Sequence, residues 1–118
     1  LALESRPAAV DALRWSAWIL AAHPDDELRR PGDAVLLARR AAELTAYRNI
    51  EVLTALAVAH MASGEFAEAI AAGEKALRQA TQDGNPDVGN LQVNLDAYRR
   101  HLRIVDETLS GGMVRQGR

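Results

Sequence analysis

The chain has no cysteine among its 118 residues. This absence excludes disulfide bonds, thiolate zinc sites and cysteine nucleophiles. Aromatic residues are also scarce at 4%, whereas hydrophobic residues make up 48% of the chain. A core that consists mainly of Ala, Leu, Val and Ile favours close-packed helices over a sheet, where aromatic and β-branched residues concentrate. We therefore expect an all-α protein.

Several classes of function also lack their sequence signatures. No apolar run reaches the 18 or so residues of a membrane span, so we expect no membrane insertion. The formal net charge is −2, and no overall basic field attracts nucleic acid. The chain contains no P-loop, dinucleotide fingerprint, nucleophile elbow or zinc-protease motif. We predict a non-enzymatic protein without a cofactor. Its first residue is Leu rather than Met, which is typical of a piece of a longer chain, and the compartment stays open.

The most regular stretch runs from residue 49 to residue 80 and predicts two antiparallel helices. They are joined by a turn at Ser63-Gly64-Glu65. Gly64 suits a left-handed residue at a helix end because it has no Cβ. Asn49 is a plausible N-cap of the first helix. On both sides of the turn, apolar residues follow the three-then-four spacing of one helix face.

This stretch resembles the tetratricopeptide repeat family, whose unit is about 34 residues long. The matching positions of the first helix are Leu53, Leu56, Ala57 and His60. The matching positions of the turn and the second helix are Gly64, Phe66, Ala69 and Ala76. The sequence departs from the family pattern at three places: it has Leu53 for the usual Trp, His60 for the usual Tyr and Thr81 for the usual Pro.

A second copy of the pattern precedes this one, because Ala34 and Ala41 recur one repeat later as Ala69 and Ala76. The loop before the helix of Ala34 resembles that of a bacterial subgroup of the family. We expect helices over about 6–23, 31–45, 49–63, 66–80 and 86–103, with Ser5 as the first N-cap. The resemblance implies a right-handed α-α superhelix (alpha solenoid) of two hairpins and a capping helix over residues 1–109. Residues 110–118 are predicted to be a disordered tail.

The resemblance implies a protein–protein interaction module that binds a peptide or partner segment in a concave groove. That groove is formed by the first helix of each repeat. Its residues in this chain would be Ser16, Leu20, Glu51, Thr54, Val58, Met61, Gln92, Asp96 and Arg99. Family members that grip a terminal carboxylate use Lys, Asn and Arg where this chain has Glu51, Thr54 and Val58. A carboxylate clamp is therefore not expected, and the surface suits a segment bound by packing.

An alternative is a structural role, in which the domain forms a homo-oligomer or packs within a larger multidomain protein. About three repeats are usually needed to bury a continuous core, and this chain offers two. Trp15 and Trp18 bear on both the binding hypothesis and the structural one. Either both are core anchors, since buried aromatic side chains dominate core energetics, or one of them is exposed for partner binding.

Histidines and carboxylates supply the candidate chemistry. His23 with Asp25, Asp26 and Glu27 is the one cluster of metal-ligand types. Consecutive residues of a loop rarely converge on one ion, so we predict a solvated acidic loop and no metal site. His60 is interpreted as a packed, hydrogen-bonded core histidine. We expect neither an orienting acid nor a nucleophile beside it in the hairpin, and hence no catalytic residue.

Overall fold

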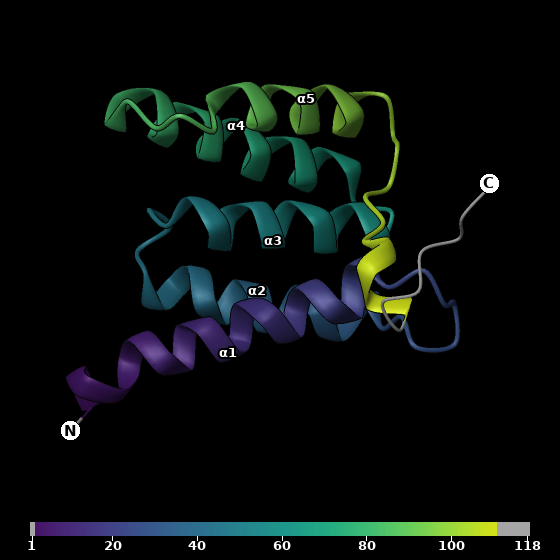
Figure 1. The fold of residues 1–118 in the computed structure, drawn as a ribbon, viewed down its shortest axis with the longest axis horizontal. Coiled ribbons are helices and arrows are strands. Elements are labelled where there is room, and N and C mark those ends of the chain that lie inside the picture. Colours follow the sequence, from purple (N-terminus) through teal and green to yellow (C-terminus); the bar gives the residue numbers. More distant parts are fainter. Residues whose placement is uncertain (1, 111–118) are drawn as a thin grey trace.

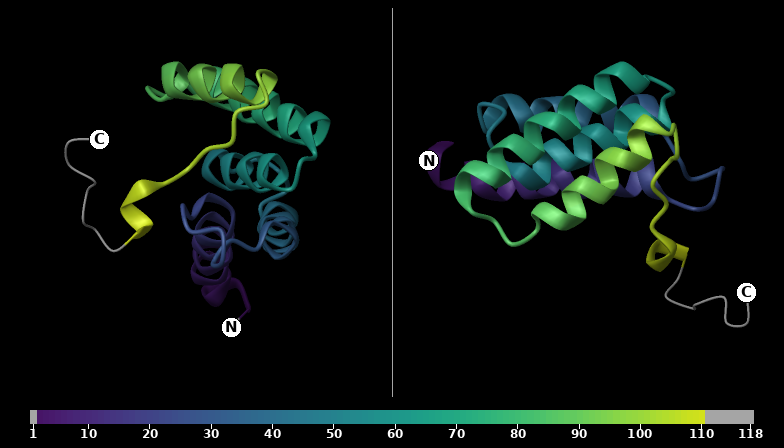
Figure 2. Two further views of the ribbon diagram at one scale, coloured as in Figure 1. Left: turned by 90° about the vertical axis from the view of Figure 1, so that its right-hand side faces the viewer. Right: turned by 90° about the horizontal axis from the view of Figure 1, so that it is seen from above.

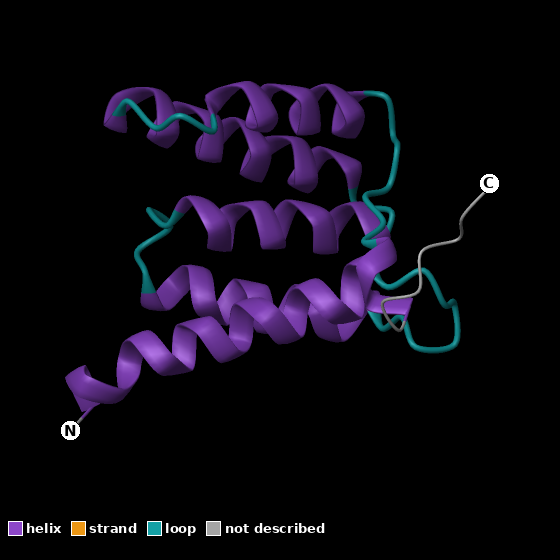
Figure 3. Ribbon diagram, viewed as in Figure 1, coloured by secondary structure: helices purple, strands orange, loops and turns teal. Residues whose placement is uncertain are grey.

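The computed structural model describes residues 2–110 of the chain, and it describes the side chains of residues 7–109. Over the described residues the protein is all-helical, with no strand (Figures 1 and 3). The α-helices are α1 (Ala2–Ala22), α2 (Pro31–Leu44), α3 (Ile50–Ala62), α4 (Phe66–Asp83) and α5 (Val88–Arg99). A short 3₁₀ helix, η1 (Glu107–Ser110), follows them. The predicted all-α class is confirmed.

The helices form successive antiparallel pairs that lie one above the other (Figures 1 and 2). Each helix contacts the next one along the chain, and α1 also contacts α3. Helix α3 therefore lies at the centre of the molecule, between α1 and α2 on one side and α4 on the other. Nine of its 13 residues are buried. This position decides which side chains of α3 can reach a partner.

Local signals placed the hairpin of α3 and α4 correctly. Asn49 caps α3, because its side chain accepts a hydrogen bond from the Val52 N–H at 3.0 Å. Gly64 adopts the left-handed conformation, with φ of 79°. The Glu65 N–H then donates to the His60 carbonyl at 2.8 Å. These bonds satisfy backbone groups that the end of a helix leaves without partners.

The ends of three helices differ from those predicted. Helix α1 begins at Ala2, so Ser5 lies inside it and is not its N-cap. Helix α4 continues to Asp83, and Gly84, which has a φ of 66°, is its C-cap. Helix α5 begins at Val88 rather than at 86, because the Asn85 side chain accepts a hydrogen bond from the Asp87 N–H. It ends at Arg99 rather than at 103. Of the predicted tail, Ser110 belongs to η1, and residues 111–118 lie outside the described residues.

Small residues allow the helices to approach closely. A Cβ added to Gly73 of α4 would lie 2.9 Å from the ring of Tyr98 on α5. Tyr98 is 1% exposed, and burial raises the pKa of its hydroxyl far above the ordinary value. In α2 the buried residues are Ala34, Val35, Ala38, Ala41 and Ala42. The core is thus built largely from alanine, as the composition indicated.

Candidate functional site

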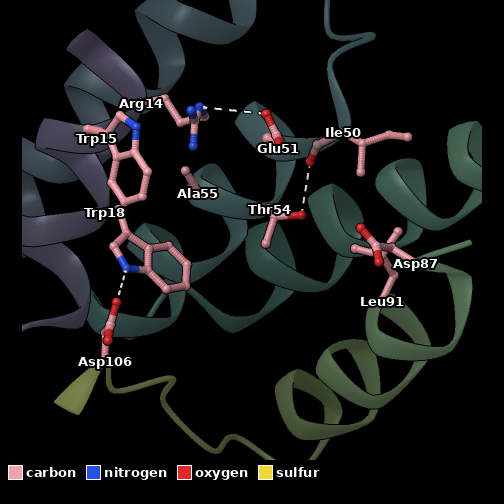
Figure 4. A pocket seen from close by; sticks show the side chains of 10 residues that line it. All are labelled: Arg14, Trp15, Trp18, Ile50, Glu51, Thr54, Ala55, Asp87, Leu91 and Asp106. Carbon is pink, nitrogen blue, oxygen red and sulfur yellow. Dashed lines mark hydrogen bonds and ion pairs between the residues drawn. The ribbon is translucent and has the colours of Figure 1, made fainter. Parts of the chain in front are cut away.

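A hollow of about 320 Å³ opens on the face where α1, α3 and the start of α5 meet (Figure 4). We call it the α1–α3–α5 pocket. Its lining residues are Arg14, Trp15 and Trp18 of α1, Ile50, Glu51, Thr54 and Ala55 of α3, Asp87 and Leu91 at α5, and Asp106. Aromatic and aliphatic side chains line its walls together with a few charged groups, which is typical of binding pockets.

The wall from α1 presents an exposed aromatic side chain. Trp15 is 52% exposed, and the guanidinium of Arg14 lies over its ring at 4.9 Å. Arg14 also pairs with Asp11 at 3.5 Å and reaches Glu51 of α3 at 3.9 Å. The interpretation of Trp15 as a core anchor is wrong, because α1 lies at the edge of the stack and no described element covers that part of it. The alternative, in which one of the two tryptophans is exposed, agrees with the structure.

Trp18 is partly buried and makes the polar contact that closes one side of the pocket. Its indole Nε1–H donates to Asp106 Oδ2 at 2.7 Å (Figure 4). The Thr108 hydroxyl donates to the other carboxylate oxygen of Asp106, as does the Thr108 N–H at 3.1 Å. These donors, first the Thr108 hydroxyl and then the Trp18 indole, lower the pKa of Asp106. Hydrogen bonds to the charged form favour it, and the carboxylate stays ionised.

The wall from α3 is fixed by the first turn of that helix. The Thr54 hydroxyl donates to the Ile50 carbonyl at 2.9 Å, so it is already engaged within the helix (Figure 4). Glu51 is exposed and faces Arg14 across the pocket. The Asn49 cap sets where this turn begins, and it thereby places Ile50, Glu51 and Thr54 at the pocket. The α3 wall therefore offers few free polar groups.

The nine predicted groove residues do not come together at one place. Glu51 and Thr54 line the pocket. Ser16 is exposed and Leu20 is half-buried on α1, while Gln92, Asp96 and Arg99 are exposed on α5; none of these five lines the pocket. Arg99 pairs with Glu74 at 3.0 Å, and Asp96 pairs with Arg100 at 3.4 Å.

The prediction that Val58 and Met61 line a groove is wrong, because both residues belong to the core. They are 0% and 3% exposed, so neither offers a surface to a partner. The physical reason is the central position of α3, which contacts α1, α2 and α4. A repeat pattern gives the side of the helix on which a residue lies, but it does not say what covers that side.

Several pocket residues were not predicted to belong to it, notably Arg14, Leu91 and Asp106. The tryptophans carried a usable signal, since the possibility that one of them is exposed was already open. Asp106 carried none. It lies beyond the last helix and reaches α1 across 88 positions of sequence.

His23, which was expected in a loop, and His60, which was expected in the core, are both buried. His23 Nδ1 accepts a hydrogen bond from the Asp25 N–H at 3.0 Å, and Asp26 pairs with Arg29. Within residues 2–110 no three groups of metal-ligand type converge. His60 Nδ1 lies 2.8 Å from Glu65 Oε1. His60 is thus a buried, hydrogen-bonded histidine as predicted, but the expectation of no acid beside it is wrong, because the turn returns Glu65 to it.

A second hollow of about 290 Å³ lies on the opposite side of α3, between α2 and α4. Its polar lining consists of Arg39, Tyr47, His60, Glu68 and Lys75. The ammonium of Lys75 lies 5.4 Å from the centre of the Tyr47 ring. Charges of both signs stand around this hollow, and it presents no exposed aromatic wall comparable to Trp15.

Comparison of the chain with family models, with curated proteins and with solved structures gives no match. Among the described residues, the helices are all too short or too polar to cross a bilayer.

Proposed function

We propose that this chain is a non-catalytic protein–protein interaction module of the tetratricopeptide type, with two helix hairpins and a capping helix arranged as a right-handed α-α superhelix. Two observations support the architecture. The alanines at equivalent repeat positions, Ala34 with Ala69 and Ala41 with Ala76, are all 1% exposed or less. On α5, Leu91, Leu95 and Tyr98 are buried, as a capping helix requires.

The function proposed for the α1–α3–α5 pocket is to bind a peptide or a segment of a partner protein. The exposure of Trp15 at the mouth of an apolar hollow is the observation that carries this proposal. Tryptophan is enriched among the residues that dominate binding energy, because its large surface is desolvated when a partner covers it. A partner that inserts an apolar side chain beside the α1 wall would cover Trp15.

The chemistry of the rim restricts the partner. Arg14 is already paired with Asp11 and Glu51, so the cationic group that a terminal-carboxylate clamp needs is engaged. Thr54 is also engaged within its helix. The pocket therefore suits a segment held mainly by packing against Trp15 and Ile50, in helical or extended form.

Peptide selection tests this proposal. The full chain would be used to select peptides from a random library displayed on phage, and the selected peptides would be titrated against two variants. Trp15→Ala removes the exposed wall of the pocket. Leu36→Ala is the matched control, because Leu36 is 62% exposed on α2 and lies outside the pocket.

We expect Trp15→Ala to weaken the selected peptides at least tenfold and Leu36→Ala to leave them unchanged, with far-UV circular dichroism verifying that both variants are folded. Peptides that bind the two variants equally well would contradict the proposal.

A structural role is the second candidate, and exposed apolar residues on two other helices favour it. Leu36 on α2 and Val93 on α5 are 62% and 67% exposed. These helices belong to opposite ends of the stack (Figure 1), where a further repeat or a second copy would add burial. Sedimentation velocity over a hundredfold concentration range tests this role. Association that is lost in a Leu36→Ser, Val93→Ser chain would support it, and a monomer at the highest concentration would contradict it.

A further inference from the structure

The chain beyond α5 returns across the pocket face to α1. We call residues 102–110 the strap. His101, with φ of 59°, turns the chain after α5, and its ring stacks on Phe66 at 4.0 Å. Residues 102–106 then run without helical structure to the end of α1, where η1 follows (Figures 1 and 2). The strap thus spans from α5 to α1 and forms one wall of the pocket through Asp106.

The strap is held on α1 in the way that a bound peptide would be held. The Asp106 N–H donates to the Ala22 carbonyl at 2.8 Å, which belongs to the last turn of α1, where carbonyls lack helical partners. The Asp106 carboxylate accepts from the Trp18 indole at 2.7 Å. Ile104, two residues earlier, packs against the hydrophobic core. A backbone bond, an acid and an aliphatic side chain thus contribute to this attachment.

Such an attachment is reversible, since each hydrogen bond to a partly exposed group contributes modestly. None of its elements is peculiar to this segment. Any extended chain supplies a backbone N–H, and an aliphatic residue two positions before an acid supplies the rest. The strap has one advantage over a separate segment, because its tether gives it an effective concentration in the millimolar range. A strap that is docked about 90% of the time would reduce the apparent affinity of a competitor about tenfold.

We propose that the strap is an intramolecular ligand of α1, and that the same surface binds an extended partner segment with an aliphatic residue two positions before an acid when the strap is released. This inference rests on the proposed function, because it concerns the same pocket. The acid accepts a hydrogen bond from the Trp18 indole, and its backbone N–H donates to the end of α1. No cationic clamp is needed, which agrees with the engaged state of Arg14.

The experiment uses the full chain and a fluorescent synthetic peptide with the sequence of residues 102–110. Asp106→Ala in the chain removes the acceptor of the Trp18 bond and so releases the strap, whereas Glu43→Ala removes an exposed acid on α2 as the control. We expect the peptide to bind the Asp106→Ala chain about fourfold more tightly than the unmodified and Glu43→Ala chains, because the free fraction of the surface rises from about 0.1 to about 0.4. A peptide that itself carries Asp106→Ala should bind both chains more weakly, and the gain should disappear when the chain also carries Trp18→Phe.

Equal affinity for the Asp106→Ala and unmodified chains would overturn the proposal, as would an affinity that does not depend on the acid of the peptide. A second readout needs no peptide. In a Trp15→Phe chain, Trp18 is the remaining tryptophan. Asp106→Ala should then increase the quenching of its fluorescence by acrylamide, and unchanged quenching would show that the strap does not dock there.

These outcomes separate the two proposals. If library-selected peptides depend on Trp15 while the strap peptide gains nothing from Asp106→Ala, the pocket is a docking site and the strap proposal is wrong. If the strap peptide binds the Asp106→Ala chain more tightly as expected while no selected peptide depends on Trp15, the surface binds only the strap of this chain. The proposed function is then wrong.

Discussion

Helices α1 and α3 form facing walls of the same pocket, yet they differ in what covers them. Helix α3 is surrounded by α1, α2 and α4, and nine of its 13 residues are buried. Helix α1 contacts α2 and α3, and it leaves Trp15 and Ile19 52% and 41% exposed. The pocket therefore combines a fixed wall, which belongs to the core, with an open wall that a partner can reach. Function is expected to depend on the open wall, and stability on the fixed one.

The largest effect should come from deleting a fully buried side chain of α3. Leu53 is 0% exposed, so Leu53→Ala should lower the free energy of unfolding by about 2–5 kcal/mol, through lost burial and the cavity left behind. Urea denaturation followed by circular dichroism measures this change. A loss below about 1 kcal/mol would mean that α3 is not the central helix.

A smaller effect should separate a core position of α3 from an exposed position of α1. Val58→Thr keeps the shape of the side chain but buries a hydroxyl, which should cost about 1–3 kcal/mol of unfolding free energy. Ser16→Thr on the exposed face of α1 should change it by no more than about 0.5 kcal/mol. The same denaturation measurement compares them. Equal losses of unfolding free energy in the two variants would mean that Val58 is not part of the core.

The attachment of the strap to α1 should contribute less than the core does. Asp106→Ala removes one hydrogen bond to a partly buried indole and should lower the free energy of unfolding by about 1 kcal/mol. In a double-mutant cycle, Asp106→Ala should cost much less in a chain that already carries Trp18→Phe, because both changes break the same hydrogen bond. Additive losses would mean that the two side chains do not interact in solution.

The smallest effect is a dependence of the strap on pH. The pKa of Asp106 is lowered in the folded chain, so its contribution is fully present above the ordinary aspartate pKa of about 4. It is lost as the pH falls through the lowered pKa. Acrylamide quenching of Trp18 in the Trp15→Phe chain should therefore stay constant from pH 7 to about 5 and increase at lower pH. The Asp106→Ala chain should already show the higher quenching at pH 7, so a pH step of equal size in that chain would contradict the assignment.

The sequence predicted what depends on local signals. The Asn49 cap, the left-handed Gly64 and the apolar spacing of the central hairpin involve residues close in sequence, and the structure has them as expected. Its errors concern what covers each helix. Val58 was assigned to a groove although α3 is apolar on nearly every side, which is itself the mark of a buried helix. The sequence left open whether Trp15 is a core anchor or exposed, and the structure has it 52% exposed.

The candidate site was predicted in part for the same reason. The face that carries Glu51 and Thr54 follows from the repeat spacing, and both residues line the pocket. The contact of Asp106 with Trp18 joins residues 88 positions apart. An irregular segment leaves no periodicity in the sequence, so its return to α1 is a tertiary feature that spacing cannot reveal.

The most direct test of the pocket as a docking site is the fluorescence of Trp15 in a Trp18→Phe chain, where it is the one remaining tryptophan. Saturation with a library-selected peptide should shift its emission to shorter wavelength and reduce acrylamide quenching at least twofold, because the partner covers the open wall. A saturating peptide that leaves both the emission and the quenching of Trp15 unchanged would contradict the account.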